Sequence, residues 1–255
     1  MKYVIVTQIK NQEDRVFEWM VYHMNQGFDS FIIYDDGSED KTIEEINKFI
    51  SEFPKIKVLI EKTDGIGGSY NINQCKNSES YGTDKSFHDR LNRSYTKGNQ
   101  IAYKNNNESI CAFIDVDEFL LTEENKKVVD IIENIFNENN IMQICVINFD
   151  VKDNYILKKN FIKENLESFE YWDDDCVNLH PIWKNRVKCI VKSKFVKNIS
   201  FVHNIIQETP NYTYYVERVY NKLRMLHFRK PNLPSSSEIK FVKNNLISEI
   251  IKNNI

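Results

Sequence analysis

The chain has 255 residues, of which 41% are hydrophobic and 28% charged, and its formal net charge is −3. A chain of this length can bury a core of its own, and it lacks the basic field that would attract nucleic acid or an anionic membrane. No apolar run approaches the roughly 20 residues needed to cross a bilayer, and the five cysteines show no C-x-x-C spacing. We therefore expect a cytoplasmic protein with no nucleic-acid partner, signal peptide or transmembrane segment, and any membrane contact to be peripheral.

Strand-like and helix-like segments alternate through the first half of the chain. In chain order, the pattern predicts a strand over 3–8, a helix over 15–26, a strand over 31–34, a helix over 41–50, a strand over 57–60, a loop over 65–84, a helix over 86–105, a strand over 110–114, a helix over 126–137 and a strand over 143–149. Strands over 187–192 and 199–202 and an amphipathic tail over 237–251 follow. Such alternation predicts an α/β fold, in which a mostly parallel sheet is flanked by helices on both faces, with a less regular C-terminal portion.

Polar residues follow three of these strands, at the edge where open α/β sheets bind ligands. They are 8–11 after the first strand, 35–40 after the second and 115–118 after the fourth. The sequence therefore predicts a binding site at the carboxyl ends of the strands.

The segment Phe113-Ile-Asp-Val-Asp-Glu-Phe119 ends a buried strand with two carboxylates one residue apart. Alternation along a strand would send Asp115 and Asp117 to the same side, where two hard oxygen ligands suit Mg²⁺ or Mn²⁺. The alternative is a turn with helix-capping acids. The tract 173–175 also contains D-x-D but follows no apolar strand, so we interpret it as a solvated loop.

The segment Tyr34-Asp35-Asp36-Gly37-Ser38 ends the second strand. It is either an ordinary turn leading into a helix or a carboxylate site that accepts the N–H of a pyrimidine base.

Together these motifs resemble those of GT-A fold glycosyltransferases, in the family 2-like and family 92-like group also described as domain of unknown function 23. The resemblance covers about residues 3–230, and FIDVDEFLL is similar to the metal motif of the group. Gln12 and Lys152 depart from the group's pattern, which has Glu and Gly there. The other matching residues are Lys10, Asn11, Glu18, Trp19, Tyr22, His23, Asn99-Gln100, Asn148-Phe149, Asp153-Asn154, 187–191, Val202-His203, 226–228 and Lys230.

The resemblance implies a divalent metal, Mn²⁺ or Mg²⁺, held by Asp115, Asp117 and His227, with His203 as second choice for the histidine. Asp115 would also contact the donor. The nucleotide base would be recognised by three residues at strand ends, Thr7, Gln8 and Asp35. Asp36 is an alternative to Asp35.

Four further roles follow from the same resemblance. Asn11 and Gln100 would contribute to substrate binding, and Lys230 would place a positive charge near the leaving diphosphate. Asp153 lies just past a core strand and is the candidate catalytic base. An equally good interpretation is that Asp153 is an exposed loop residue without a catalytic role.

The chain is thus expected to be one GT-A domain over 1–255, with a nucleotide-sugar half (1–120), an acceptor half (121–235) and a C-terminal helical tail (236–255). The expected activity is metal-dependent transfer of a hexose from a UDP-sugar or a similar donor to the hydroxyl of a glycan or another acceptor, with inversion, in polysaccharide synthesis.

Two alternatives remain open. A non-catalytic nucleotide-sugar or glycan-binding module would keep this fold. A haloacid-dehalogenase-type phosphatase also has Asp-x-Asp at a strand end, but its motif continues with Gly-Thr, whereas Glu118-Phe119 follows here.

Overall fold

The computed structural model describes residues 1–65, 85–122, 126–138, 141–150, 171–173, 187–200, 203, 205–206, 213–215, 223–227 and 241–243. The helices are α1 (Val16–Asn25), α2 (Thr42–Glu52), α4 (Lys85–Asn105), α5 (Val128–Glu138) and the 3₁₀ turn η3 (Ser193–Phe195). The strands are β1 (Tyr3–Ile9), β2 (Ser30–Asp35), β3 (Lys57–Lys62), β4 (Ile110–Phe113), β5 (Glu118–Leu121), β6 (Gln143–Asp150), β7 (Tyr171–Asp173), β8 (Val187–Lys192), β9 (Thr213–Tyr215), β10 (Arg224–His227) and β11 (Phe241–Lys243).

One sheet organises the described part of the chain, with strand order β3-β2-β1-β4-β8-β6-β10-β5 and β9 paired to β6. The first four strands are parallel to one another, and β8 lies antiparallel between β4 and β6. Strand β10 runs parallel to β6, and β5 returns antiparallel beside β10. The predicted α/β class with a mostly parallel sheet is therefore confirmed.

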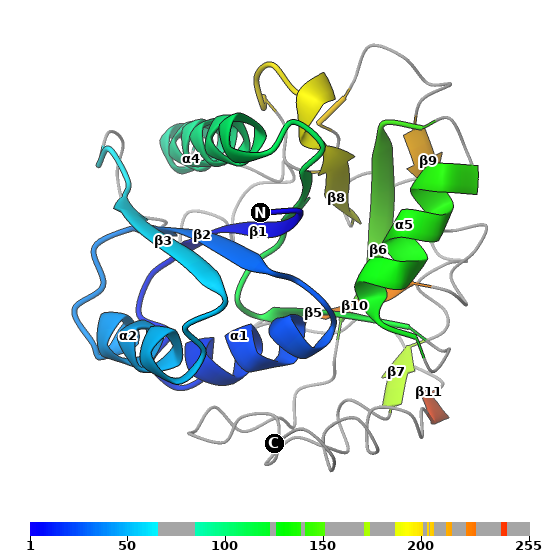
Figure 1. Ribbon diagram of the computed structural model, residues 1–255. Helices are drawn as coiled ribbons and strands as arrows, with labels where there is room; N and C mark the ends of the chain where they lie inside the picture. The colour runs from blue at the N-terminus through cyan, green and yellow to red at the C-terminus, as the bar shows by residue number, and fades with distance from the viewer. Residues whose placement is uncertain are drawn as a thin grey trace.

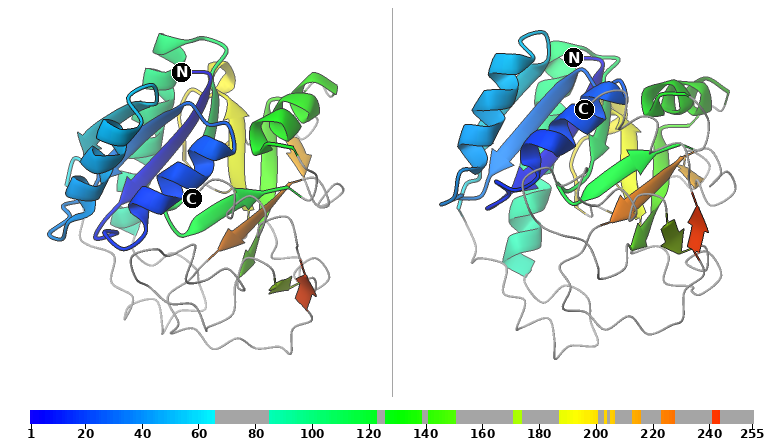
Figure 2. Two further views of the ribbon diagram at one scale, coloured as in Figure 1. Left: turned by 60° about the horizontal axis from the view of Figure 1, so that its bottom comes forward. Right: turned by 90° about the horizontal axis from the view of Figure 1, so that it is seen from below.

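Helices cover both faces of the parallel strands, as predicted: α1 and α2 lie on one face and α4 on the other (Figure 1; Figure 2). Strands β1, β2 and β4 are almost completely buried, as expected for a sheet covered on both sides. Helix α4 approaches β1 closely at Gly98, where an added Cβ would lie 2.4 Å from Val6 Cγ1. A side chain at this position would push α4 off the sheet.

Several details differ from the expected elements, and strands β7, β9 and β10 were not predicted. Strand β4 ends one residue early, at Phe113, and the short strand β5 that follows was not predicted, because a segment of four residues is too short to show a clear period. Residues 199–200 form no strand, since Ile199 donates its N–H to Thr96 Oγ1 on α4. Residues 241–243 form strand β11, paired to β7, where a helical tail was expected, because pairing can override helical periodicity in a short segment. The rest of the expected tail lies outside the described residues.

No helix among the described residues is both long and apolar enough to cross a membrane.

Candidate active site

The two motif aspartates lie in a turn between β4 and β5. Glu118 donates its N–H to the carbonyl oxygen of Asp115 at 3.0 Å, which closes a four-residue turn. The premise that strand alternation orients Asp115 and Asp117 is therefore wrong, because the strand has already ended at Phe113. The orientation of each carboxylate is determined instead by its own contacts.

The carboxylate of Asp115 is held on both oxygens. Lys188 Nζ lies 2.6 Å from Asp115 Oδ2, and the hydroxyl of Tyr95 donates to Oδ1 at 3.2 Å. The side chain of Asp115 is still 39% exposed, whereas Lys188 is buried. A carboxylate offers about four lone-pair positions, so Asp115 keeps acceptor capacity toward solvent.

Glu118 lies behind this contact and is completely buried. Its Oε2 accepts the N–H of Asp115 at 2.8 Å and lies 3.3 Å from Lys188 Nζ. Burial raises the pKa of Glu118 to about 7 against the opposing effect of Lys188. Burial alone would lower the pKa of Lys188, but Asp115 and Glu118 outweigh it and raise that pKa above its usual value.

Asp117 faces a histidine that lies 110 positions later in the sequence. His227, the last residue of β10, pairs in register with Glu118, and its Nε2 lies 3.7 Å from Asp117 Oδ2. Burial would raise the pKa of Asp117, but His227 and the charges of Arg15 and Lys188 outweigh it and hold that pKa below its usual range. The other candidate, His203, contacts the carbonyl of Val187 at 2.6 Å through Nδ1.

The Asp117–His227 pair fits a divalent metal by donor type and spacing. One ion about 2.1 Å from each atom would span their 3.7 Å separation. Among the described residues, no group of three or more His, Cys, Asp or Glu side chains forms a metal cage. In proteins, Mg²⁺ commonly completes its coordination with substrate phosphates and water.

The motif residues of α1 hold β5 rather than line the site. Trp19 Nε1 donates to the carbonyl of Glu118 at 2.8 Å, and the Tyr22 hydroxyl donates to the carbonyl of Leu120 at 2.8 Å. The N–H of Leu120 points to Nε2 of His23 at 3.4 Å. These side chains satisfy backbone groups on the side of β5 that faces away from β10.

The tautomer of His23 follows from its two contacts. Its Nδ1 lies 2.9 Å from the carbonyl of Trp19, so Nδ1 carries the proton and Nε2 accepts from Leu120. Burial lowers the pKa of His23 to about 3, which keeps the ring neutral. The acidic turn is thus tied to α1 through uncharged hydrogen bonds.

Asn11 and its neighbours join the loops that follow β1 and β2. Asn11 adopts a positive φ of 52°, which Asn tolerates, and its Oδ1 accepts the N–H of Glu39 at 2.9 Å. Its own N–H donates to Ser38 Oγ at 3.0 Å, and Gln12 donates its N–H to Thr42 Oγ1. Asn11 therefore shapes the rim of the strand ends, while its role toward a substrate stays a prediction.

The two aspartates after β2 have different surroundings. Asp35 is buried and caps the turn, since its Oδ1 accepts the N–H of Ser38 at 3.0 Å. Asp36 is bound by Arg90 of α4, with Nε 2.8 Å from Oδ1 and Nη2 2.9 Å from Oδ2, and by the hydroxyl of Thr63 at 2.7 Å. The structure thus gives Asp35 a turn contact and links Asp36 to α4.

Buried polar atoms without a hydrogen-bond partner occur at the end of β1. They are the hydroxyl of Thr7 and both amide atoms of Gln8. Val6 faces α4 at Gly98, so Gln8, two residues later, also lies on the α4 side. Because β1 pairs with β4 up to Val6↔Phe113, Gln8 lies at the same edge of the sheet as the turn that follows β4.

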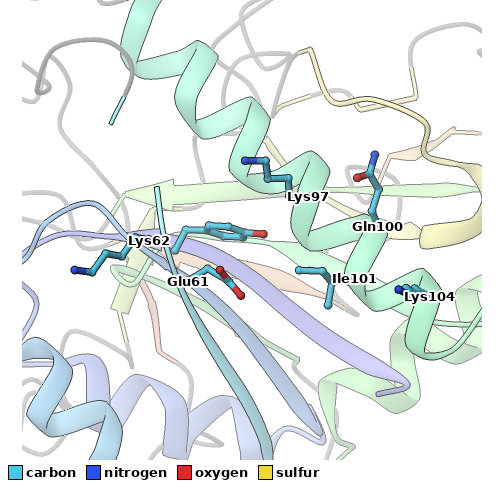
Figure 3. A pocket seen from close by; sticks show the side chains of 7 residues that line it. Glu61, Lys62, Lys97, Gln100, Ile101 and Lys104 are labelled. Atoms are coloured by element: carbon cyan, nitrogen blue, oxygen red, sulfur yellow. The ribbon is translucent and has the colours of Figure 1, made fainter. Parts of the chain in front are cut away.

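Gln100 lies elsewhere, in a groove of about 300 Å³ between α4 and the edge strand β3 (Figure 3). None of its partners in the groove was predicted as a site residue. The lining residues are Tyr34, Glu61, Lys62, Lys97, Gln100, Ile101 and Lys104. The structure therefore does not bring Gln100 together with the acidic turn. Asp153 and Lys230 lie outside the described residues.

Sequence reasoning gave no role to Lys188, Glu118 and Tyr95. The signal for Lys188 was a lone cation inside an otherwise apolar strand, VKCIV. Glu118 directly follows the second aspartate of the motif, and Tyr95 lies on a helix with no motif of its own. Only the pairing of β4 with β8 brings Lys188 to the turn.

The sheet and the acidic turn at its carboxyl edge define a protein of the open-sheet α/β class, in which ligands commonly bind at that edge. The family model of glycosyltransferase family 92 matches residues 6–254, so the chain belongs to this family. The resemblance inferred from the motifs is thereby confirmed. The comparison with curated proteins finds no match.

Several solved structures are similar to the chain in fold. Glucosyl-3-phosphoglycerate synthase from Mycobacterium tuberculosis shares 10% identity over 91% of this chain and 73% of its own, with a TM-score of 0.45. HddC from Yersinia pseudotuberculosis shares 12% identity over 100% of this chain and 98% of its own, with a TM-score of 0.40. A mannosyltransferase from Pyrobaculum calidifontis, in complex with GDP-Man and Mn²⁺, shares 9% identity over 58% of this chain, with a TM-score of 0.39. The chain spans 35% of that mannosyltransferase and 44% of another synthase structure, so the assignment rests on the family model.

Proposed function

We propose that this family 92 glycosyltransferase moves a hexose from a nucleoside-diphosphate sugar, with a UDP-sugar as the favoured donor, to an acceptor hydroxyl with inversion. The observation that carries the proposal is the contact of Asp117 with His227 beside the Asp115 turn, at the carboxyl edge of the sheet. Acceptors would be glycans or other hydroxyl compounds in cytoplasmic polysaccharide synthesis.

Asp117 and His227 would hold Mn²⁺ or Mg²⁺, and Asp115 would accept a hydrogen bond from a donor hydroxyl. When bound, the metal supplies Lewis-acid stabilisation of the charge that develops on the leaving diphosphate. Arg15 lies buried at the start of α1, close enough to influence the charge of Asp117. Its guanidinium adds a fixed positive charge beside the diphosphate position.

The unpartnered amide of Gln8 supports a base site at the end of β1. An amide offers a donor and an acceptor side by side, which matches the N–H and C=O pattern on the edge of a uracil ring. A buried amide without partners costs about 1–3 kcal/mol, and a bound base would remove that cost. Asp35 would complete the proposed base site, whereas the side chain of Thr7, next to Gln8 in β1, points to the opposite face of the sheet by strand alternation.

The remaining catalytic roles are also proposals. Asp153 would remove the proton from the acceptor hydroxyl, because an alcohol is a poor nucleophile at neutral pH. Lys230 would assist the leaving group. Neither residue lies in the described part of the chain.

A thermal-shift screen tests the function directly. UDP, GDP, CMP and UDP-sugars are each added with and without Mn²⁺ to the wild type and to Asp117→Ala. A ligand at 100 times its Kd stabilises the folded state by about 2.7 kcal/mol, or roughly 5–10 °C for a chain of this size. The matched control is Asp130→Ala, which removes an exposed carboxylate of α5.

The expected result is a Mn²⁺-dependent shift with one nucleoside diphosphate, kept in Asp130→Ala and lost in Asp117→Ala while the ligand-free Tm stays within a few degrees. An unchanged shift in Asp117→Ala would overturn the metal assignment. Release of UDP from a UDP-sugar then separates a transferase from a binding module of the same fold, which would bind without turnover.

A further inference from the structure

Lys188 is a buried cation directly beside the acidic turn. Between Lys188 and the last residue of the strand, Lys192, β8 is apolar, with Cys189, Ile190 and Val191 completely buried. Because Cys189 pairs with Phe113, the last residue of β4, Lys188 lies level with the start of the turn. A lysine at such a position is expected to be paired, since an isolated buried charge is costly.

The contacts of Lys188 are unequal and divide the acidic residues of the turn. Its Nζ lies 2.6 Å from Asp115 Oδ2 and 3.3 Å from Glu118 Oε2, while Asp117 faces His227. Tyr95 holds the second oxygen of Asp115. The carboxylate of Asp115 is thus bound by the ammonium group of Lys188 and the hydroxyl of Tyr95, whereas the carboxylate of Asp117 faces the imidazole of His227.

We propose that Lys188 is a positioning residue that keeps Asp115 out of the metal's coordination and orients it toward a hydroxyl of the donor. Asp117 and His227 then bind the metal without a second carboxylate of the motif. This inference rests on the proposed function, because it assigns a division of labour within that same site.

The physical reason is charge balance. A metal next to two free carboxylates is bound tightly, but the extra negative charge repels the diphosphate that must bind to the same ion. Lys188 neutralises Asp115, which weakens binding of the metal alone and strengthens binding of the nucleotide. Glu118 keeps the ammonium group in place from the buried side, at 3.3 Å.

The proposal predicts opposite changes in two affinities when the charge of Lys188 is removed. In Lys188→Met, the Kd for Mn²⁺ alone is expected to fall about tenfold, while the Kd for UDP at saturating Mn²⁺ rises about tenfold, each equivalent to about 1.4 kcal/mol. A residue with a merely structural role would weaken both.

The variants are chosen so that folding does not decide the answer. Lys188→Met leaves the carboxyl group of Glu118 buried without its cation, so the double variant Lys188→Met with Glu118→Gln is measured beside it. Glutamine can still accept the N–H of Asp115 through its amide oxygen. Lys188→Arg keeps the positive charge and is expected to retain wild-type Mn²⁺ affinity, with UDP affinity reduced less than tenfold.

Isothermal titration with Mn²⁺ alone, and then with UDP in excess Mn²⁺, gives both constants for each folded variant. Tighter Mn²⁺ with weaker UDP in the methionine variants, and not in Lys188→Arg, supports the inference. Equal or weaker Mn²⁺ binding in the methionine variants, or a tenfold change in Lys188→Arg, overturns it. A wild type that binds neither Mn²⁺ nor UDP refutes the proposed function itself and the inference with it.

Discussion

Two regions with buried polar groups differ in how those groups are satisfied. On α1, the side chains of Trp19, Tyr22 and His23 each bond to the backbone of β5. At the end of β1, Thr7 and Gln8 have buried polar atoms with no hydrogen-bond partner among the residues that the structure describes. Both regions contain residues that the motifs singled out, but the polar groups of the first region are hydrogen-bonded and those of the second, within the described part of the chain, are not.

This difference separates residues that build the site from residues that are available to a ligand. The α1 side chains act in place of a neighbouring strand for β5, and β5 begins where the acidic turn ends. They therefore support the turn that carries Asp117 through the backbone of β5. Unsatisfied groups such as the amide of Gln8 carry a cost in the folded protein that a bound partner would relieve.

The largest expected effect comes from Trp19→Ala. Trp19 is completely buried and packs against the rings of His23 and Phe31 at 4.8 and 5.9 Å. Its loss creates a cavity and removes the hydrogen bond to the carbonyl of Glu118, so we expect stability to fall by roughly 3–5 kcal/mol. Urea unfolding measures the change, with Tyr103→Ala, which removes a ring that is 47% exposed, as control. A loss below 1 kcal/mol would contradict a structural role for the α1 motif.

A smaller effect, visible in the pH dependence, is expected for His23→Gln. The pKa of His23 is lowered from 6.5 to about 3, so below pH 6.5 the unfolded chain binds a proton that the folded chain does not. This contribution to stability is complete above pH 6.5 and falls as the pH is lowered toward 3. At pH 5 the loss of stability from this source amounts to about 2 kcal/mol.

Glutamine can donate to Trp19 and accept from Leu120 without titrating. Urea unfolding at pH 7.5 and pH 5 should therefore show the wild type losing about 2 kcal/mol more than His23→Gln between the two pH values. Equal losses would mean that His23 takes up its proton without unfolding, which would remove the neutral link between α1 and β5.

The smallest effect on stability, and the sharpest test of the comparison, is expected for Gln8→Met. Methionine fills a similar volume without the unpartnered amide, so stability should stay equal or rise by about 1 kcal/mol, while UDP affinity falls about tenfold. The matched control is Gln143→Met, because Gln143 Oε1 accepts the N–H groups of Ile205 and Ile206, both at 2.9 Å.

The control should lose at least 1–3 kcal/mol of stability and keep its UDP affinity. A stability loss in Gln8→Met comparable to that of Gln143→Met would place Gln8 with the structural residues instead. UDP binding by calorimetry and urea unfolding supply both readouts.

Much of the first half of the fold could be predicted from sequence, because its elements are long and strongly periodic. Strands β1 to β3 and helices α1, α2 and α4 lie close to their expected bounds. Strands β5 and β10 were missed, since each has only four residues and depends on partners distant in sequence. The same holds for the candidate site. The acidic motif could be recognised in a short stretch of sequence, but the role of Lys188, the cation that holds Asp115, could not.

By itself, the sequence determined the α/β class, the position of the acidic motif after a buried strand and the family to which the chain belongs. Hydrophobic period and motif order are local properties, so they can be read without coordinates. Only the tertiary structure decided that Lys188 faces Asp115, that His227 faces Asp117 and that α1 bonds to β5. Those contacts depend on strand register between segments about 70 to 110 residues apart, and pairing over such separations leaves no periodic trace in either segment.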